Sequence, residues 1–247
     1  MAGRTAPAGT VVSEAFVRAF HAAHAGAMSR AFARGGSYDR LAALVPAGAR
    51  VLDLACSDGA LLERLGAHAI GVDVSLDELA LARGRVAQAR AQELPVASSS
   101  LDVVTCHLAF MLFDEPERVV AEVARVLAPG GEFIAVLGGG PVADADRDDV
   151  FHRFVTMLGP SNRLGDRRTR SESGWRTLFD GWNVMPFERW EVELGGGFDD
   201  AWAFLSTSYE LAAHDAARIR DELHAIVGEH ASCRAALFLA RAQRRRG

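Results

Sequence analysis

An acidic side chain and a turn of small residues stand out as groups that could recognise a nucleoside. The run Val51 to Gly59 reads VLDLACSDG, an apolar stretch that predicts a buried parallel strand at 51–55, followed by a small-residue turn. Asp53 lies inside the apolar run, where a carboxylate must be hydrogen-bonded, so we expect it to organise the turn that follows. Asp73 closes a second apolar run, AIGVDV, twenty residues beyond Asp53. Small residues let a ligand approach the backbone, and an acid at the end of a second strand can accept both hydroxyls of a ribose.

A third segment, Ala91-Gln92-Glu93-Leu94-Pro95, follows a weaker strand and can frame a base. The turn itself, A-C-S-D-G-A, lacks the G-x-G-x-x-G of dinucleotide sites, and no G-x-x-x-x-G-K-[ST] occurs. These absences disfavour a nicotinamide-dependent oxidoreductase and give no sign of a P-loop. A nucleoside-type cofactor without phosphates fits the pattern better.

These groups need strands that end at a common edge. Residues 51–137 alternate short apolar runs with helical patterns, which predicts parallel strands joined by right-handed crossovers. The expected fold is α/β, Rossmann-like, with helices on both faces of a seven-stranded, mostly parallel sheet. Its strands are expected at 51–55, 69–74, 85–91, 101–108, 132–137, 182–194 and 233–242.

The flanking regions are expected to cover this sheet. Apolar residues at helical spacing predict one helix over 11–34, weakened by Gly26, and Ser37 is the expected N-cap of a helix over 38–45. We therefore divide the chain into an N-terminal helical lid, 1–36, and a catalytic domain, 37–247. Cap elements are expected in about 140–230, with a helix over 144–158, a mobile loop at 159–173 and a helical region over 199–227 that breaks near His214.

Composition narrows the class of protein. The 247 residues carry a formal net charge of -5, which argues against a nucleic-acid partner. Cys56, Cys106 and Cys233 lack metal-binding or disulfide spacing, so we expect buried thiols in a reducing, cytoplasmic setting and no metal site. No apolar run reaches roughly 18 residues, so no membrane span is expected.

Residues 49–137 resemble the class I S-adenosylmethionine-dependent methyltransferases, especially the small-molecule group that includes ubiquinone and menaquinone methyltransferases. VLDLACSDG is similar to that family's V-L-D-x-G-C-G-x-G, IGVDVSLDELALAR to its ribose-binding segment, and AQELPVASSSLDVVTCHLAFMLFDEPERVVAEVARVLAPGGEFIAV to the stretch that runs into its fifth strand. The resemblance implies S-adenosyl-L-methionine as cofactor. The positions it implies for cofactor binding are Asp53, Ala55, Cys56, Ser57, Gly59, Asp73, Val74, Ala91, Gln92, Glu93, His107 and Tyr38.

Three residues depart from the family pattern. Ala55 and Ser57 replace glycines of the turn, and Arg90 stands where an acid meets the adenine amino group. An arginine accepts no hydrogen bond, so either Gln92 replaces that acid or backbone and stacking hold the adenine.

The catalytic group is not fixed by the resemblance. The family's methyl donor is already activated, so the protein mainly aligns the reactants, and a base is needed only if the acceptor loses a proton. His107, His24 and His21 are the candidates, and each has an alternative as a packed histidine. Arg163, Arg167, Arg168 and Arg170 either recruit an acidic acceptor or form a solvated face, while Trp202, Phe204 and Tyr209 indicate core or pocket lining.

We therefore expect a methyltransferase that acts on a small-molecule acceptor, without nucleic-acid or membrane partners, as a monomer or homodimer. One alternative is an RNA or protein methyltransferase, but His107-Leu108-Ala109-Phe110 stands where an N/D-P-P-Y/F run would signal methylation of a base. Another is a non-catalytic S-adenosylmethionine-binding module, which Ser57 and Arg90 keep open. O-, N- and C-methylation all remain open.

Overall fold

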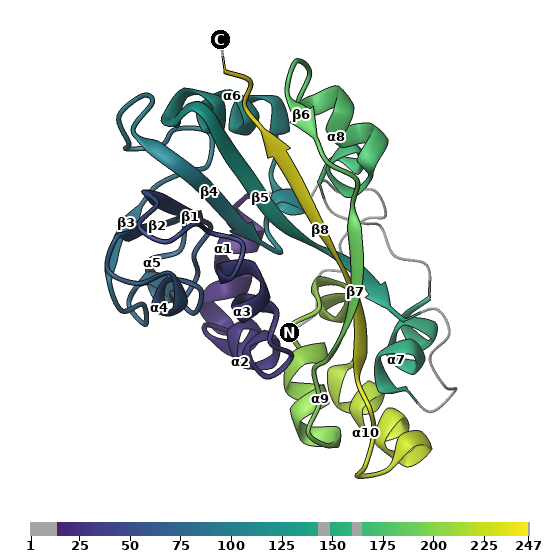
Figure 1. Cartoon of the computed structure of the whole chain (residues 1–247). Helices are drawn as coiled ribbons and strands as arrows, with labels where there is room; N and C mark the ends of the chain where they lie inside the picture. Colours follow the sequence, from purple (N-terminus) through teal and green to yellow (C-terminus); the bar gives the residue numbers. More distant parts are fainter. Residues whose placement is uncertain (1–13, 143–148, 160–164, 247) are drawn as a thin grey trace.

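Eight strands form one sheet in the computed structural model, which describes residues 14–142, 149–159 and 165–246 (Figure 1). The strands are β1 Val51–Leu54, β2 Ala69–Asp73, β3 Arg85–Gln88, β4 Leu101–His107, β5 Leu127–Pro141, β6 Asn183–Val184, β7 Glu188–Glu193 and β8 Arg234–Gln243. Their order is β3-β2-β1-β4-β5-β8-β6, with β7 also paired to β8. All pairs among β1 to β5 are parallel, and β8 runs antiparallel to β5.

The predicted fold class is confirmed, with two corrections to the strands. The strand expected at 132–137 is longer at both ends, since β5 runs from Leu127 to Pro141. The single strand expected at 182–194 is two strands, β6 and β7, because Pro186 lacks the N–H that a continuous ladder needs. Both pair with β8 on the same side, β6 near Ala242 and β7 from Arg234 to Leu239, so eight strands fill seven positions.

Apolar side chains cover both faces of the sheet. Along β5, Phe133 packs in one core with Trp175, and Ile134 packs in another with Phe154. Period-two alternation along a strand produces this division. Helices α4 Leu62–Leu65, α5 Leu76–Leu79 and α6 Pro116–Val126 connect the parallel strands, and Ser75 caps α5 by accepting a hydrogen bond from the Glu78 N–H at 3.3 Å.

The N-terminal region forms three short helices, α1 Glu14–Ala23, α2 Ala27–Arg34 and α3 Ser37–Ala42. The prediction of one helix over 11–34 is wrong where it crosses Gly26, whose φ of 71° breaks the helix, and residues 11–13 lie outside the described part. Ser37 is not an N-cap, because Gly36 takes that position. The Ser37 hydroxyl instead donates to the Phe32 carbonyl at 3.2 Å.

The C-terminal half adds α7 Val150–Leu158, α8 Glu172–Leu178, α9 Phe198–Leu205 and α10 Ala216–Val227, with short 3-10 turns η2 Arg167–Arg170 and η3 Tyr209–Ala213. The break expected near His214 in the helical region 199–227 is confirmed, because η3 ends at Ala213 and α10 begins at Ala216, but a second break separates α9 from η3. The start of the helix expected at 144 lies outside the described residues. In the loop expected at 159–173, residues 160–164 are likewise not described, but 167–170 form η2 and α8 begins at Glu172. Helices α2 and α9 pack together beside the sheet edge (Figure 1).

Candidate functional site

A cavity of about 470 Å³ opens where the parallel strands end. Ala55 follows β1, Asp73 ends β2, Ala91 follows β3, His107 ends β4 and Gly138 lies in the last part of β5, and all five line the cavity. Ligands of open α/β sheets bind at this edge.

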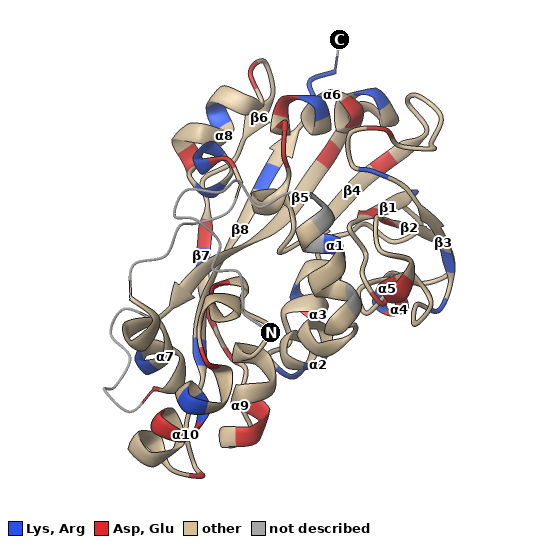
Figure 2. Ribbon diagram, turned by 180° about the vertical axis from the view of Figure 1, so that it is seen from behind, with Lys and Arg blue, Asp and Glu red and all other residues tan. Residues whose placement is uncertain are grey.

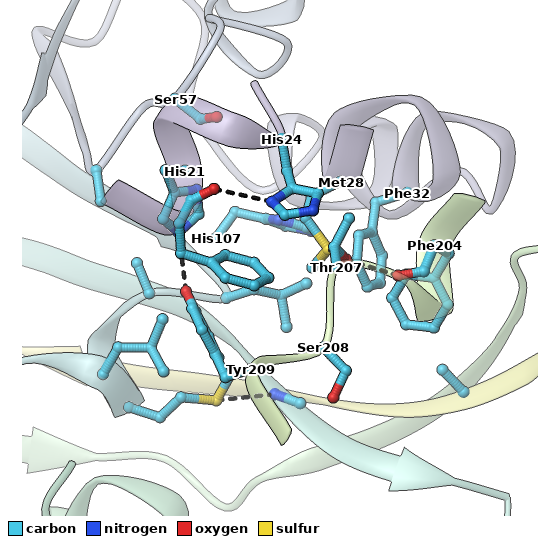
Figure 3. Close-up of a pocket in the computed structure, with 18 of the residues that line it drawn as sticks. His21, His24, Met28, Phe32, Ser57, His107, Phe204, Thr207, Ser208 and Tyr209 are labelled. Atoms are coloured by element: carbon cyan, nitrogen blue, oxygen red, sulfur yellow. Dashed lines mark hydrogen bonds between the residues drawn. The ribbon is translucent and has the colours of Figure 1, made fainter. Parts of the chain in front are cut away.

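The cavity has two unlike walls. The polar wall is formed by eight of the twelve predicted cofactor positions, namely Ala55, Ser57, Asp73, Val74, Ala91, Gln92, His107 and Tyr38. The apolar wall comes from α1, α2, the segment after β4, α7 and α9, with Phe20, Met28, Phe32, Met111, Phe151 and Phe204. Figure 3 shows Met28, Phe32 and Phe204 in this wall.

The turn after β1 uses a backbone conformation that glycine adopts without strain. Ala55 and Ser57 have φ angles of 58° and 51°, in the left-handed region. The Cys56 N–H between them donates to the Val72 carbonyl at 3.0 Å and ties the turn to β2. Both residues that replace family glycines therefore adopt a backbone conformation that favours glycine.

Asp73 has the geometry of a hydroxyl acceptor. Its Oδ2 accepts from the Ser57 N–H at 2.9 Å and its Oδ1 from the Ser75 N–H at 2.8 Å, so each oxygen keeps a further lone pair. Burial raises the pKa of Asp73, and the two backbone N–H groups act in the opposite direction. The side chain lines the cavity, so these lone pairs fit the two hydroxyls of a ribose.

The segment after β3 offers one oriented amide. The Gln92 Nε2–H donates a hydrogen bond to the Asp114 carbonyl at 2.8 Å, so Oε1 remains as an acceptor at the polar wall. Arg90 also lines the cavity, and its carbonyl accepts from the Glu93 N–H at 3.0 Å. Gln92 Oε1 thus has the acceptor chemistry of the acid that the family carries at Arg90.

Four of the predicted positions lie outside the lining formed by the described residues: Asp53, Cys56, Gly59 and Glu93. The position of Asp53 suggested that its side chain holds the turn after β1, and the structure contradicts this. The carboxylate accepts instead from the Thr105 hydroxyl on β4 at 3.0 Å. Burial raises the pKa of Asp53 to about 7, with Thr105 opposing the shift.

His107 is packed at the cavity floor. Its Nε2 lies 2.9 Å from the Ser37 hydroxyl, and its ring centroid lies 4.3 Å from that of Tyr38. Because the Ser37 proton goes to the Phe32 carbonyl, His107 is the donor. Burial lowers the pKa of His107 to about 3, so the ring stays neutral. Burial also raises the pKa of Tyr38, which lines the cavity beside it.

The other two histidines lie on α1 and differ in what their nitrogens do (Figure 3). His21 Nδ1 lies 3.3 Å from Glu78 Oε1, and its Nε2 lies 2.8 Å from the Tyr209 hydroxyl. His24 Nδ1 lies 2.9 Å from the Phe20 carbonyl oxygen, and its ring stacks on Phe20 with centroids 4.4 Å apart. A carbonyl only accepts, so His24 carries its proton on Nδ1.

The sequence did not single out most of the apolar wall. Phe204 and Tyr209 were expected as core or lining, and both line the cavity, whereas Trp202 packs against the core. Phe20 and Met28 show helical spacing but give no sign of facing a ligand. Among the arginines, Arg170 lines the cavity, Arg168 pairs with Asp166 at 2.6 Å, and Arg163 lies outside the described residues.

Comparison with known proteins agrees with this geometry. A methyltransferase domain matches residues 52–135. Phosphatidylethanolamine N-methyltransferase of Cereibacter sphaeroides is 33% identical over 164 residues, which cover 54% of this chain and 79% of that protein. The chain belongs to the class I S-adenosylmethionine-dependent methyltransferases. The cofactor of this family is S-adenosylmethionine, and the lone pairs of Asp73 fit its ribose.

Two further relatives show how far the likeness extends. Demethylmenaquinone methyltransferase of Thermus thermophilus is 37% identical over 109 residues, covering 38% of this chain and 49% of that protein. The Bacillus subtilis methyltransferase YcgJ is 29% identical over 174 residues, covering 60% of this chain and 65% of that protein. The YcgJ crystal structure superposes with a TM-score of 0.57 at 21% identity, covering 87% of this chain and 99% of that one, which shows the shared fold. The chain thus matches less than two thirds of the length of both relatives.

The described part of the methyltransferase contains no helix long and apolar enough to cross a membrane.

Proposed function

We propose that this protein transfers a methyl group from S-adenosylmethionine to a small-molecule acceptor with an apolar body. The observation that carries the proposal is one cavity with a polar wall at the strand ends and an apolar, largely aromatic wall opposite. Such a wall stabilises a bound apolar body by about 25 cal/mol for each Å² of apolar surface that it removes from water. The quinone- and lipid-modifying activities in the names of two relatives are compatible with an acceptor of this kind.

The polar wall would hold the cofactor. Asp73 would accept the two ribose hydroxyls, Gln92 Oε1 the adenine amino group, and the left-handed turn at Ala55 and Ser57 would let the cofactor approach the backbone. Bound there, S-adenosylmethionine supplies a methyl group already activated on a sulfonium. The apolar wall would exclude water and align the acceptor.

His24 is the residue that we assign as proton acceptor when the methylated group must lose a proton. Its Nδ1–H is held by the Phe20 carbonyl, so the neutral ring carries its lone pair on Nε2, and the side chain lines the cavity. His21 engages both nitrogens, and the lowered pKa of about 3 leaves His107 a poor base. A hydroxyl or amine acceptor would give up its proton to His24.

The wider setting follows from the same features. We propose a cytoplasmic protein, monomeric or homodimeric, with the segment 1–36 as a lid and cap elements within 140–230. Its three cysteines are all buried thiols. Arginines and acidic residues are interspersed along the described elements, which supports an acceptor other than nucleic acid (Figure 2).

Titration calorimetry with S-adenosylmethionine tests the proposal. Asp73→Ala removes two charge-assisted hydrogen bonds of about 1.5–3 kcal/mol each, so the affinity should fall by roughly 100-fold or more. The matched control is Asp102→Asn, which changes a half-exposed aspartate paired with Arg50 at the start of β4, and it should bind as the wild type does. Unchanged binding by Asp73→Ala, or no binding by the wild type, would defeat the proposal.

A further inference from the structure

Glu78 is a buried carboxylate that joins three parts of the molecule. It lies on α5 and is 3% exposed. Its Oε2 accepts from the Gly26 N–H at 3.2 Å, and its Oε1 lies 3.3 Å from His21 Nδ1. Burial acts to raise the pKa of Glu78, but side-chain hydrogen bonds from His21 and Ser57, with the Gly26 N–H, outweigh it and hold the pKa below its ordinary value. Glu78 thus links the turn after β1 to the segment between α1 and α2.

Tyr209 extends this link to the C-terminal half of the chain. Its hydroxyl lies 2.8 Å from His21 Nε2, and its ring centroid lies 4.6 Å from that of Phe20 (Figure 3). A carboxylate only accepts, so Glu78 keeps the His21 proton on Nδ1, and Nε2 then accepts the phenol proton. Burial raises the pKa of Tyr209, and the charges of Asp73 and Glu78 act in the same direction, so the phenol keeps this proton.

Tyr209, His21 and Glu78 therefore form a continuous chain of contacts beside the cavity. His21, Tyr209, Ser57 and Asp73 all line the same cavity, although 188 residues separate the first two in sequence. Opening α1 away from η3 breaks the His21–Tyr209 bond, and opening it away from α5 breaks the His21–Glu78 bond. The residues that these two bonds hold in place line the same cavity as Asp73.

We propose that Tyr209, His21 and Glu78 form a latch that holds α1–α2 (residues 14–34) and η3 closed over the cofactor edge of the cavity. These are positioning residues, and Ser57 couples the latch to the turn that would hold the cofactor. The inference rests on the proposed function, because the gated ligand is the cofactor. The hydroxyl of Ser57, at a position where the family carries glycine, serves this latch.

The test measures binding rates of S-adenosylhomocysteine, the demethylated product, by surface plasmon resonance on the full chain. Tyr209→Phe keeps the ring packed on Phe20 and removes only the hydroxyl. A net hydrogen bond contributes about 1 kcal/mol, so association and dissociation should both accelerate by roughly fivefold while the equilibrium constant changes far less. If Tyr209→Phe fails to fold, His21→Ala takes its place in the test. It removes the same bond from the α1 side, and both rates should again accelerate.

A matched control changes another contact between the N-terminal helices and the C-terminal half of the chain. Arg34 on α2 pairs with Asp200 on α9 at 2.9 Å on the exposed outer surface, so Asp200→Asn should leave both rates unchanged. Unchanged rates in Tyr209→Phe overturn the latch, and so does faster dissociation alone, because it would make the hydroxyl a ligand contact. Equal acceleration by Asp200→Asn also overturns it.

Hydrogen exchange separates this inference from the proposed function. Without ligand, Tyr209→Phe should raise amide exchange in α1 several-fold over the wild type and leave exchange in α6 unchanged. A wild type that binds no S-adenosylhomocysteine would defeat the proposed function and the cofactor role of the latch. Unchanged exchange in α1, with binding retained, would defeat the latch alone.

Discussion

The two walls of the cavity are built in different ways. Most of the polar wall comes from the ends of β1, β2 and β3 and the short segments that follow them, and backbone hydrogen bonds orient it, as at Asp73. The apolar wall gathers side chains from α1, α2, α7 and α9, and ring contacts orient it: Phe204 lies 5.6 Å from Phe32 and 5.4 Å from Phe151 between centroids. Backbone bonds fix positions closely, whereas packed rings tolerate exchange, so the polar wall suits a constant ligand and the apolar wall a variable one.

The largest effect that we expect tests how the polar wall is supported. In the folded protein burial raises the pKa of Asp53 to about 7, while the unfolded chain has its ordinary value of 3.8. The folded state therefore binds the proton more tightly, and its advantage is complete below the unfolded pKa and lost as the pH rises through 7. Between pH 5 and pH 8 the free energy of unfolding should therefore fall by roughly 3 kcal/mol, because each pH unit up to the folded pKa of about 7 removes about 1.4 kcal/mol.

Asp53→Asn removes this titration and keeps an oxygen for the Thr105 hydroxyl. Urea unfolding at pH 5 and at pH 8 gives the fall in unfolding free energy between these two pH values. This fall should be about 3 kcal/mol smaller in Asp53→Asn than in the wild type. Asp102→Asn is the control, because the Arg50 guanidinium holds the pKa of that carboxylate at about 2, below the range tested. Parallel pH profiles of wild type and Asp53→Asn would contradict the prediction.

The next effect tests whether the apolar wall is independent of the cofactor. Phe204→Ala removes a half-buried ring between Phe32 and Phe151 and should lower the unfolding free energy by about 2 kcal/mol. Because no polar group of the opposite wall bonds to this ring, affinity for S-adenosylhomocysteine should stay within about threefold of the wild type. Phe204→Leu, which keeps most of the volume, should lose less than half as much stability. A large loss of cofactor affinity would show that the two walls are coupled.

The sequence predicted the polar wall far better than the apolar one, and the reason is local. Each polar segment follows its strand within a few residues, so a strand pattern alone places Ala55, Asp73 and Ala91 at one edge. The apolar wall depends on helix packing between segments about 180 residues apart, which no periodicity encodes. Helical spacing could place Phe204 and Tyr209 on a buried face, but not opposite His21.

The failures of local prediction also have local physical causes. Gly26 and Pro186 broke a helix and a strand that looked continuous, because one adopts a left-handed φ and the other lacks an N–H. Ser37 has the chemistry of an N-cap, but tertiary partners, the Phe32 carbonyl and His107, use its hydroxyl instead. Asp53 likewise bonds across to β4, where a turn contact was expected.

The smallest effect separates the two residues that replace family glycines in the polar wall. Ala55→Gly relieves a left-handed conformation that costs about 1 kcal/mol, but glycine adds a similar entropy to the unfolded chain, so stability should change by less than about 0.5 kcal/mol. Ser57→Gly has the same backbone balance and also loses the hydroxyl bonded to Glu78, so it should be about 1 kcal/mol less stable. Urea unfolding of the two variants side by side cancels the backbone contribution. If both behave alike, the Ser57 hydroxyl adds nothing, and the polar wall is held by its backbone alone.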